Sequence, residues 1–144
     1  MWNHIKQLTA DDLDLMNSLL DCFGEAFEEL DTYGKNRPDA SYMREFLGSK
    51  TFISLVAHIN NNVVVGLAAY VLKKFEQKRS EVYIYDLAVN ERLRRKGIAS
   101  ALINELKNIA KARGAWVVFV QADSANSASR QASLPFRLQL IRGD

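Results

Sequence analysis

The stretch YIYDLAVNERLRRKGIASALI, residues 83–103, decides the fold of this chain. Its first part, Tyr83–Val89, is aromatic or aliphatic apart from Asp86, which predicts a strand. A basic loop follows, and Gly97 then opens a run of apolar residues at helical spacing. A strand, a loop and a helix in this order predict a right-handed crossover to a parallel strand, which we place at 115–123.

Periodicity on either side of this stretch completes a mixed sheet flanked by helices, the α+β (α/β) class. The expected strands are 3–8, 51–59, 63–72, 81–89 and 115–123, and the expected helices are 9–30, 40–49 and 98–114. Thr9 is a suitable N-cap for the first helix, which we expect to break near Gly24. Residues 31–39 are expected to form a loop, and Asn60–Asn62 the turn of a hairpin.

The composition is that of one ordinary domain of 144 residues, with 48% apolar and 25% charged residues. The single cysteine, Cys22, lies on an apolar helical stripe and is expected in the core, and it excludes an intrachain disulfide. His4 and His58 have no partner at metal-ligand spacing, so no metal site is expected. Neither a signal peptide nor a membrane-spanning run is recognised, which predicts a cytoplasmic protein.

The charges are distributed unevenly along the chain. Up to Asp31 there are eight acidic residues against one base, Lys6, whereas from Lys73 to Arg113 there are eleven bases against five acids. The first part suits a cationic partner and the second an anionic one, although the solvated faces of two amphipathic helices would look the same.

The basic loop carries the pattern R-x-x-G-x-A over Arg94–Ala99. A glycine at this point lets the backbone approach a ligand closely. The free N–H groups of the first helical turn, together with the helix dipole, form an anion site. Arg94, Arg95 and Lys96 bring positive charge to the same place. The pattern therefore indicates pyrophosphate binding.

With this loop, the order of elements resembles the GCN5-related N-acetyltransferase superfamily, which uses acetyl-CoA. The chain is most similar to the aminoglycoside 3-N-acetyltransferases, through FGEAFEELDTY, SKTFISLVA, GLAAYVLKKFEQKRSEVYIYDLAV, RRKGIASALI and VQAD. The resemblance runs from about Leu8 to Asp123. It implies an acetyltransferase domain over 1–123 and an atypical tail over 124–144.

The resemblance also implies where acetyl-CoA binds. Backbone groups of the strand pair with the pantetheine arm, and the loop and first helical turn wrap the pyrophosphate. The implied residues are Leu87, Ala88 and Val89 for the arm, and Arg94, Arg95, Lys96, Gly97, Ile98, Ala99 and Ser100 for the pyrophosphate.

Acetyl transfer requires a neutral amine, so a base must remove a proton from the ammonium form. Asp86 is the expected base, and strand alternation is expected to place it on the side of Val82 and Ile84, opposite Tyr83 and Tyr85. Glu81, acting through a water molecule, is the alternative. A structural role for Asp86 also stays open.

The family resemblance places the acceptor groove beside the end of the first helix, where acidic residues gather. Ammonium groups of an aminoglycoside would bind there by charge-assisted hydrogen bonds. The candidate acceptor-binding residues are Glu28, Glu29, Asp31, Tyr85 and Asp123.

The chain departs from the family pattern after Asp123. The tail SANSASRQASLPFRLQLIRGD contains no tyrosine to act as the general acid that many members of the superfamily use. It also lacks the family's closing strands, so the strand at 115–123 is expected to keep an open edge, covered by FRLQLI or by a partner subunit. We expect a homodimer.

The sequence thus predicts an acetyl-CoA-dependent N-acetyltransferase that acts on an amino group of an aminoglycoside, at the 3-position, and confers antibiotic resistance. Two alternatives stay open: acetylation of another polyamine or small amine, and a CoA-binding relic without turnover. Nucleic-acid binding through RLRRK is not expected, because aromatic interleaving and a strongly basic charge are both missing.

Overall fold

The protein is seen in a computed structural model that describes residues 5–90, 97–120 and 141–142. One six-stranded sheet, in the order β1-β2-β3-β4-β5-β6, crosses the molecule. Its strands are β1 Ile5–Gln7, β2 Phe52–Ile59, β3 Asn62–Lys73, β4 Ser80–Val89, β5 Val117–Val120 and β6 Ile141–Arg142. β4 and β5 are parallel and all other neighbours antiparallel, which confirms the mixed sheet and the crossover.

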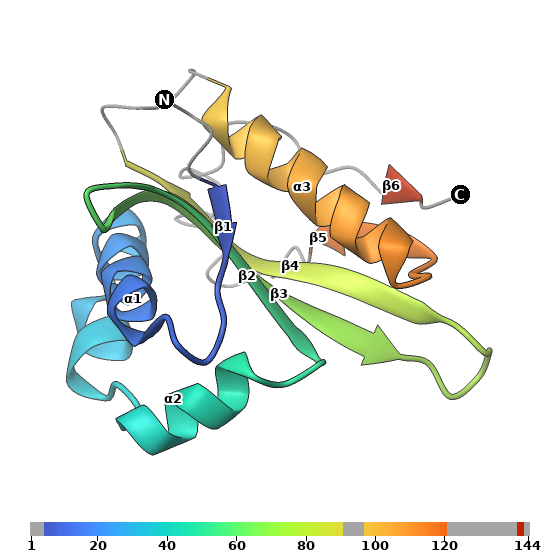
Figure 1. Cartoon of the computed structure of the whole chain (residues 1–144), viewed down its shortest axis with the longest axis horizontal. Coiled ribbons are helices and arrows are strands. Elements are labelled where there is room, and N and C mark those ends of the chain that lie inside the picture. Colours follow the sequence, from blue (N-terminus) through green and yellow to red (C-terminus); the bar gives the residue numbers. More distant parts are fainter. Residues whose placement is uncertain (1–4, 91–96, 121–140, 143–144) are drawn as a thin grey trace.

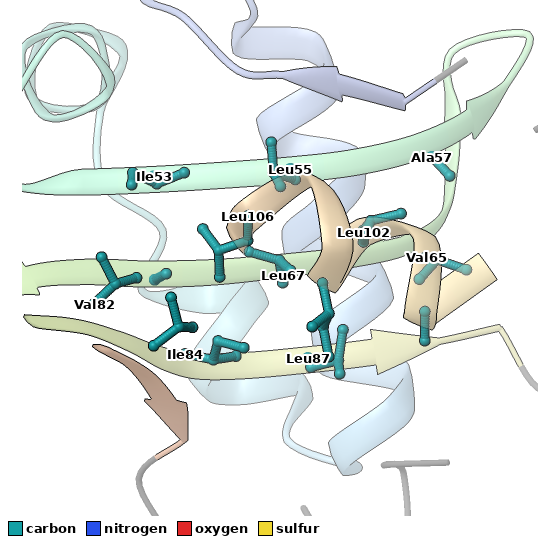
Figure 2. Close-up of a cluster of buried hydrophobic side chains, with 14 of the residues drawn as sticks. Ile53, Leu55, Ala57, Val65, Leu67, Val82, Ile84, Leu87, Leu102 and Leu106 are labelled. Carbon is teal, nitrogen blue, oxygen red and sulfur yellow. The ribbon is translucent and has the colours of Figure 1, made fainter. Parts of the chain in front are cut away.

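Helices cover both faces of the sheet (Figure 1). α1 Leu13–Phe27, the short π-helix η1 Asp31–Lys35 and α2 Ala40–Leu47 lie on one face, and α3 Ile98–Ala112 lies on the other. Figure 2 shows Leu102 and Leu106 of α3 packed over Leu67 and its neighbours on the sheet. A second buried cluster joins α1 and α2 to the opposite face. Burial of these two apolar surfaces against the sheet is the main stabilisation of the fold.

The first helix differs from the sequence prediction at both ends. Its N-cap is Asp12 rather than Thr9, and the Asp12 carboxylate accepts hydrogen bonds from the Thr9 amide (2.8 Å) and hydroxyl (3.0 Å). The expected break at Gly24 is wrong, because the helix continues to Phe27 and ends on Glu28 in the left-handed conformation. The residues expected as a loop include η1. The second helix is confirmed, and Gly48 is its C-cap.

The β2–β3 hairpin forms as predicted from the asparagines. Asn60 and Asn61 both have positive φ, 50° and 66°, and Ile59 pairs directly with Asn62. Asparagine tolerates this region better than most residues, so a two-residue turn closes the hairpin and fixes the register of β3.

A β-bulge interrupts β4 at Tyr85. Ala69 pairs with Ile84 and the preceding Ala68 with Asp86, so Tyr85 is an extra residue on β4. Val82, Ile84, Leu87 and Val89 therefore all face α3, while Ala88 belongs to the cluster under α1. The predicted orientation of Asp86 is wrong for this reason: it lies on the face of Tyr83 and Tyr85, opposite Val82 and Ile84.

The end of the chain contributes an edge strand. β6 pairs antiparallel with β5, with Ile141 opposite Val118 and Arg142 opposite Val117. FRLQLI, residues 136–141, was one of the two expected covers for β5; β6 shares only Ile141 with it and continues to Arg142, and residues 136–140 lie outside the described residues. The homodimer stays a prediction. Among the described helices, none is long and apolar enough to cross a membrane.

Gly66 of β3 is required by close packing against α1. A Cβ at this position would overlap Cδ1 of Leu19, a fully buried side chain. We expect Gly66→Ala to lower the free energy of unfolding by about 1–3 kcal/mol, because the core must shift to accept the methyl group. Gly34→Ala is the control, since no described atom lies within 4 Å of its added Cβ. Equal denaturation midpoints for the two variants in urea would contradict this packing.

Candidate active site

A buried carboxylate, Asp86, lies on the sheet face beneath α1 and η1. Only 5% of the residue is exposed. Its Oδ2 accepts a hydrogen bond of 2.8 Å from the hydroxyl of Tyr33 on η1. The bulge at Tyr85 gives Asp86 this orientation, since regular alternation would have turned it toward α3. Asp86 is thus largely shielded from water and accepts a hydrogen bond from a tyrosine hydroxyl. A shielded carboxylate of this kind is suited to proton transfer.

Tyr33 was not predicted as a site residue. The contact joins residues 53 positions apart, and a tyrosine in an expected loop carries no signal for such a partner. Its ring packs against Phe23 and Phe27 of α1, with centroids 5.7 and 5.9 Å away. Its carbonyl accepts two hydrogen bonds from Arg37, at 3.0 and 2.7 Å. The residue is therefore fixed at the ring, the backbone and the hydroxyl.

An acidic hollow lies beside Tyr33 at the C-terminal end of α1. Its volume is about 490 Å³, and it is lined by Gly24, Glu25, Glu28, Glu29, Leu30 and Asp31. The predicted acceptor residues Glu28, Glu29 and Asp31 are thus brought together. The negative end of the helix dipole adds to these carboxylates, so the hollow favours cations. A Cβ on Gly24 would lie 3.4 Å from Tyr33 Cβ, which places the hollow against the residue that binds Asp86.

Exposed aromatic side chains border Asp86 on the side of α2. Tyr85 is 40% exposed, and its ring meets that of Tyr70 edge-on at 5.6 Å. Tyr70 in turn contacts Phe46 and Phe52. Burial raises the pKa of Tyr70, and the nearby Tyr85 and Asp86 raise it further, so its hydroxyl stays neutral at physiological pH. The half-exposed rings of Tyr70 and Tyr85 are of the kind that can stack on ammonium groups.

Glu81, the alternative base, occupies a different environment at the start of β4. Both its oxygens have partners: Oε2 accepts from Arg79 Nε at 3.0 Å, and Oε1 accepts from the Tyr83 hydroxyl at 3.3 Å. Lys74 Nζ lies 3.9 Å from Oε1. The Arg79 guanidinium also stacks on Trp116, 3.9 Å from the ring centroid. This ion-pair cluster gives Glu81 a structural role at the base of the β3–β4 hairpin.

The groups expected to bind acetyl-CoA lie along the second half of β4 and the start of α3. Among the described residues, the pairing of β4 with β5 ends at Ile84, before Leu87–Val89. Gly97 is the N-cap of α3 with φ 76°, and the first intrahelical bond runs from Ala101 N to Gly97 O. The amides of Ile98, Ala99 and Ser100 precede that bond and are oriented as anion donors. The side chains of Ile98 and Ala99 are buried, so they would act through the backbone.

Several predicted site residues lie outside the described residues. They are Arg94, Arg95 and Lys96 of the basic loop and Asp123 after β5.

The single cysteine, Cys22, lies on α1. Cys22 is buried as predicted, and burial, with Glu25 and Asp21 nearby, raises the pKa of its thiol to about 12. It therefore stays protonated, unlike a nucleophilic thiolate. No group of three or more potential metal ligands is found in the described ranges.

Comparison with known proteins identifies the family. A family model described as the acetyltransferase (GNAT) family matches residues 13–132. No curated protein matches the chain.

Solved structures extend the comparison. The aminoglycoside acetyltransferase HMB0005, from an uncultured soil metagenomic sample, is 55% identical over 84% of this chain and 80% of that chain, with a TM-score of 0.80. The aminoglycoside acetyltransferase meta-AAC0020, also from uncultured soil and in complex with sisomicin, is 30% identical over 96% and 91% of the two chains, with a TM-score of 0.74. A predicted acetyltransferase from Clostridium acetobutylicum, with acetyl-CoA, shares the fold at 17% identity over 89% and 86%, with a TM-score of 0.64.

Proposed function

Because the chain belongs to the acetyltransferase (GNAT) family, we propose that it transfers the acetyl group of acetyl-CoA to an amino group of an aminoglycoside. The observation that carries the proposal is the buried Asp86, bound by Tyr33, whose Cβ lies against Gly24 of the acidic hollow. Two similar structures are aminoglycoside acetyltransferases, and one of them is in complex with sisomicin. We assign the transfer to the 3-amino group, and such acetylation would confer resistance.

Acetyl-CoA supplies an acetyl group activated as a thioester. Asp86 takes a proton from the acceptor ammonium, and the neutral amine attacks the thioester carbonyl. A backbone N–H of β4, which we assign to Leu87, stabilises the oxyanion. The C–N bond forms and the C–S bond breaks. The second proton of the attacking nitrogen passes to water, water protonates the thiolate, and Asp86 returns its proton to solvent. The first amides of α3 at Ile98–Ser100 hold the pyrophosphate, with Arg94, Arg95 and Lys96 as proposed further ligands.

The acceptor is a polycation, and the acidic hollow supplies opposite charge at the end of α1. Two of its carboxylates, Glu28 and Glu29, come from the residues directly after the helix. Tyr85 adds an aromatic face next to Asp86. In this arrangement one ammonium group reaches the base while the others contact carboxylates.

Neutralising the hollow should weaken acceptor binding and leave chemistry intact. We expect the double variant Glu28→Gln/Glu29→Gln to raise the KM for sisomicin about tenfold, because partly solvated charge pairs contribute up to about 1 kcal/mol each. The matched control is Asp11→Asn/Asp14→Asn, which removes the same charge from exposed positions near the start of α1. If the two double variants raise the KM equally, the change in net charge explains the result and the hollow does not.

The proposed function is tested by measuring release of free CoA thiol from acetyl-CoA with sisomicin as acceptor. NMR of the product would locate the new acetyl group, and transfer to the 3-amino group is the expected result. Release of CoA thiol with spermidine but not with sisomicin would show that the acceptor is a polyamine and not an aminoglycoside. If CoA raised the melting temperature but neither acceptor caused thiol release, the result would favour a CoA-binding relic without turnover.

A further inference from the structure

Tyr33 touches both halves of the proposed site. Its hydroxyl donates to Asp86, and its backbone lies two residues beyond Asp31, which lines the acidic hollow. We propose that Tyr33 is the positioning residue of Asp86, and that η1 couples the acceptor hollow to the carboxylate. The inference rests on the proposed function for its kinetic consequence, but the contact itself can be tested without turnover.

Tyr33 is held in place by its backbone and its ring as well as by its hydroxyl. Tyr33 N donates to Glu29 O at 3.1 Å, which continues the chain directly from the end of α1 into η1. Arg37, which binds the Tyr33 carbonyl, is itself held by Asp21 of α1 at 2.8 Å. The tyrosine ring lies against Phe23 and Phe27. A tyrosine fixed in this way holds the Asp86 carboxylate in one orientation. Short π-helical segments such as η1 also occur often at functional sites.

The hydroxyl of Tyr33 also acts on the ionisation of Asp86. A donor to the carboxylate favours its charged form, and the lack of this donor would raise the pKa of a buried carboxyl. The other titratable groups on this side are Tyr70 of β3, Tyr85 of β4, Cys22 of α1 and the carboxylates at the end of α1: Asp21, Glu25, Glu28, Glu29 and Asp31. Tyr70 and Cys22 have raised pKa values and stay neutral near pH 7. The carboxylates of the hollow are the same in the unaltered protein and in Tyr33→Phe, so a difference between the two pH profiles reports the loss of the donor to Asp86.

The test replaces only the hydroxyl. Tyr33→Phe keeps the ring contacts with Phe23 and Phe27, and melting temperature checks the fold. We expect the acid limb of the kcat/KM profile to shift to higher pH by about one unit. At pH values below the midpoint kcat/KM should then fall about tenfold, and at higher pH it should fall less. The KM for acetyl-CoA should be unchanged.

Tyr83→Phe is the matched control. Tyr83 lies on the same strand as Asp86, but its hydroxyl donates to Glu81. If Glu81 were the base, the Tyr83→Phe profile would shift and the Tyr33→Phe profile would not. That result would overturn the inference.

A second measurement tests the contact between Tyr33 and Asp86 without enzymatic turnover. In protein labelled with carboxyl-¹³C aspartate, Asp86→Asn identifies the Asp86 resonance, and its titration is compared between the unaltered protein and Tyr33→Phe. A higher midpoint in Tyr33→Phe supports the positioning role, and equal midpoints overturn it. Absence of acetylation in the unaltered protein would defeat the proposed function, while the NMR titration would still decide the role of Tyr33.

Discussion

Asp86→Asn should lower kcat for acetyl transfer to sisomicin by about 10²–10⁴-fold, the range typical for loss of a general base. Asparagine has the same shape and still accepts the Tyr33 hydrogen bond, but it cannot take the proton of an ammonium group. The thermal shift produced by CoA should be unchanged, because the expected cofactor contacts lie on Leu87–Val89 and at the start of α3. Steady-state kinetics of thiol release measures the effect.

The comparison with Glu81→Gln makes this result specific. Glu81 is ion-paired with Arg79 and contacted by Lys74, so its neutralisation should lower stability more than catalysis. We expect kcat for Glu81→Gln to stay within a few-fold of the unaltered enzyme. Full activity of Asp86→Asn together with an inactive Glu81→Gln would transfer the role of base to Glu81.

Gly97→Val should raise the KM for acetyl-CoA by about 10–100-fold, equivalent to about 1.4–2.8 kcal/mol of binding free energy. Gly97 has φ 76°, a conformation that a β-branched residue adopts only with strain. In the described part of the chain nothing lies within 4 Å of an added Cβ, so the new side chain would project into the space before the helix amides. Titration of initial rates with acetyl-CoA at saturating sisomicin measures the change.

Gly114→Val provides a closely matched control. Gly114 follows the other end of α3, also has φ 76° and also has open space around an added Cβ. Its strain should therefore be similar, while its distance from the helix N-terminus leaves the anion site intact. If Gly114→Val raised the KM for acetyl-CoA as much as Gly97→Val, backbone strain and not anion binding would explain both results.

The features that the sequence predicted well are local or strongly periodic. The hairpin turn follows from consecutive asparagines, and α3 follows from apolar spacing between Gly97 and Gly114. The residues that line the acidic hollow are neighbours along the chain, Glu25–Asp31, and the family resemblance is what predicted an acceptor groove beside them. In each case the signal and the structure involve the same few residues.

The features that the sequence did not predict are of two kinds: a choice between two neighbouring capping residues, and contacts with partners far along the chain. Thr9 and Asp12 are both good capping residues, and the choice of Asp12 is known only from its bonds to Thr9. The partner of Tyr33 is 53 residues away. The bulge is hidden because Tyr83–Val89 alternates acceptably in either register, and only the pairing with Ala68 and Ala69 fixes the faces.

The extra residue at Tyr85 decides on which face of the sheet the later side chains of β4 lie. If the strand were straightened with Tyr85 kept, Asp86 would turn into the apolar layer beneath α3, and Leu87 and Val89 would leave that layer. Loss of Tyr85 itself would change neither, because Ile84 and Asp86 already pair with the adjacent Ala69 and Ala68. The bulge therefore keeps the acid in its site and the core closed, whereas the half-exposed side chain at position 85 can be exchanged without moving either.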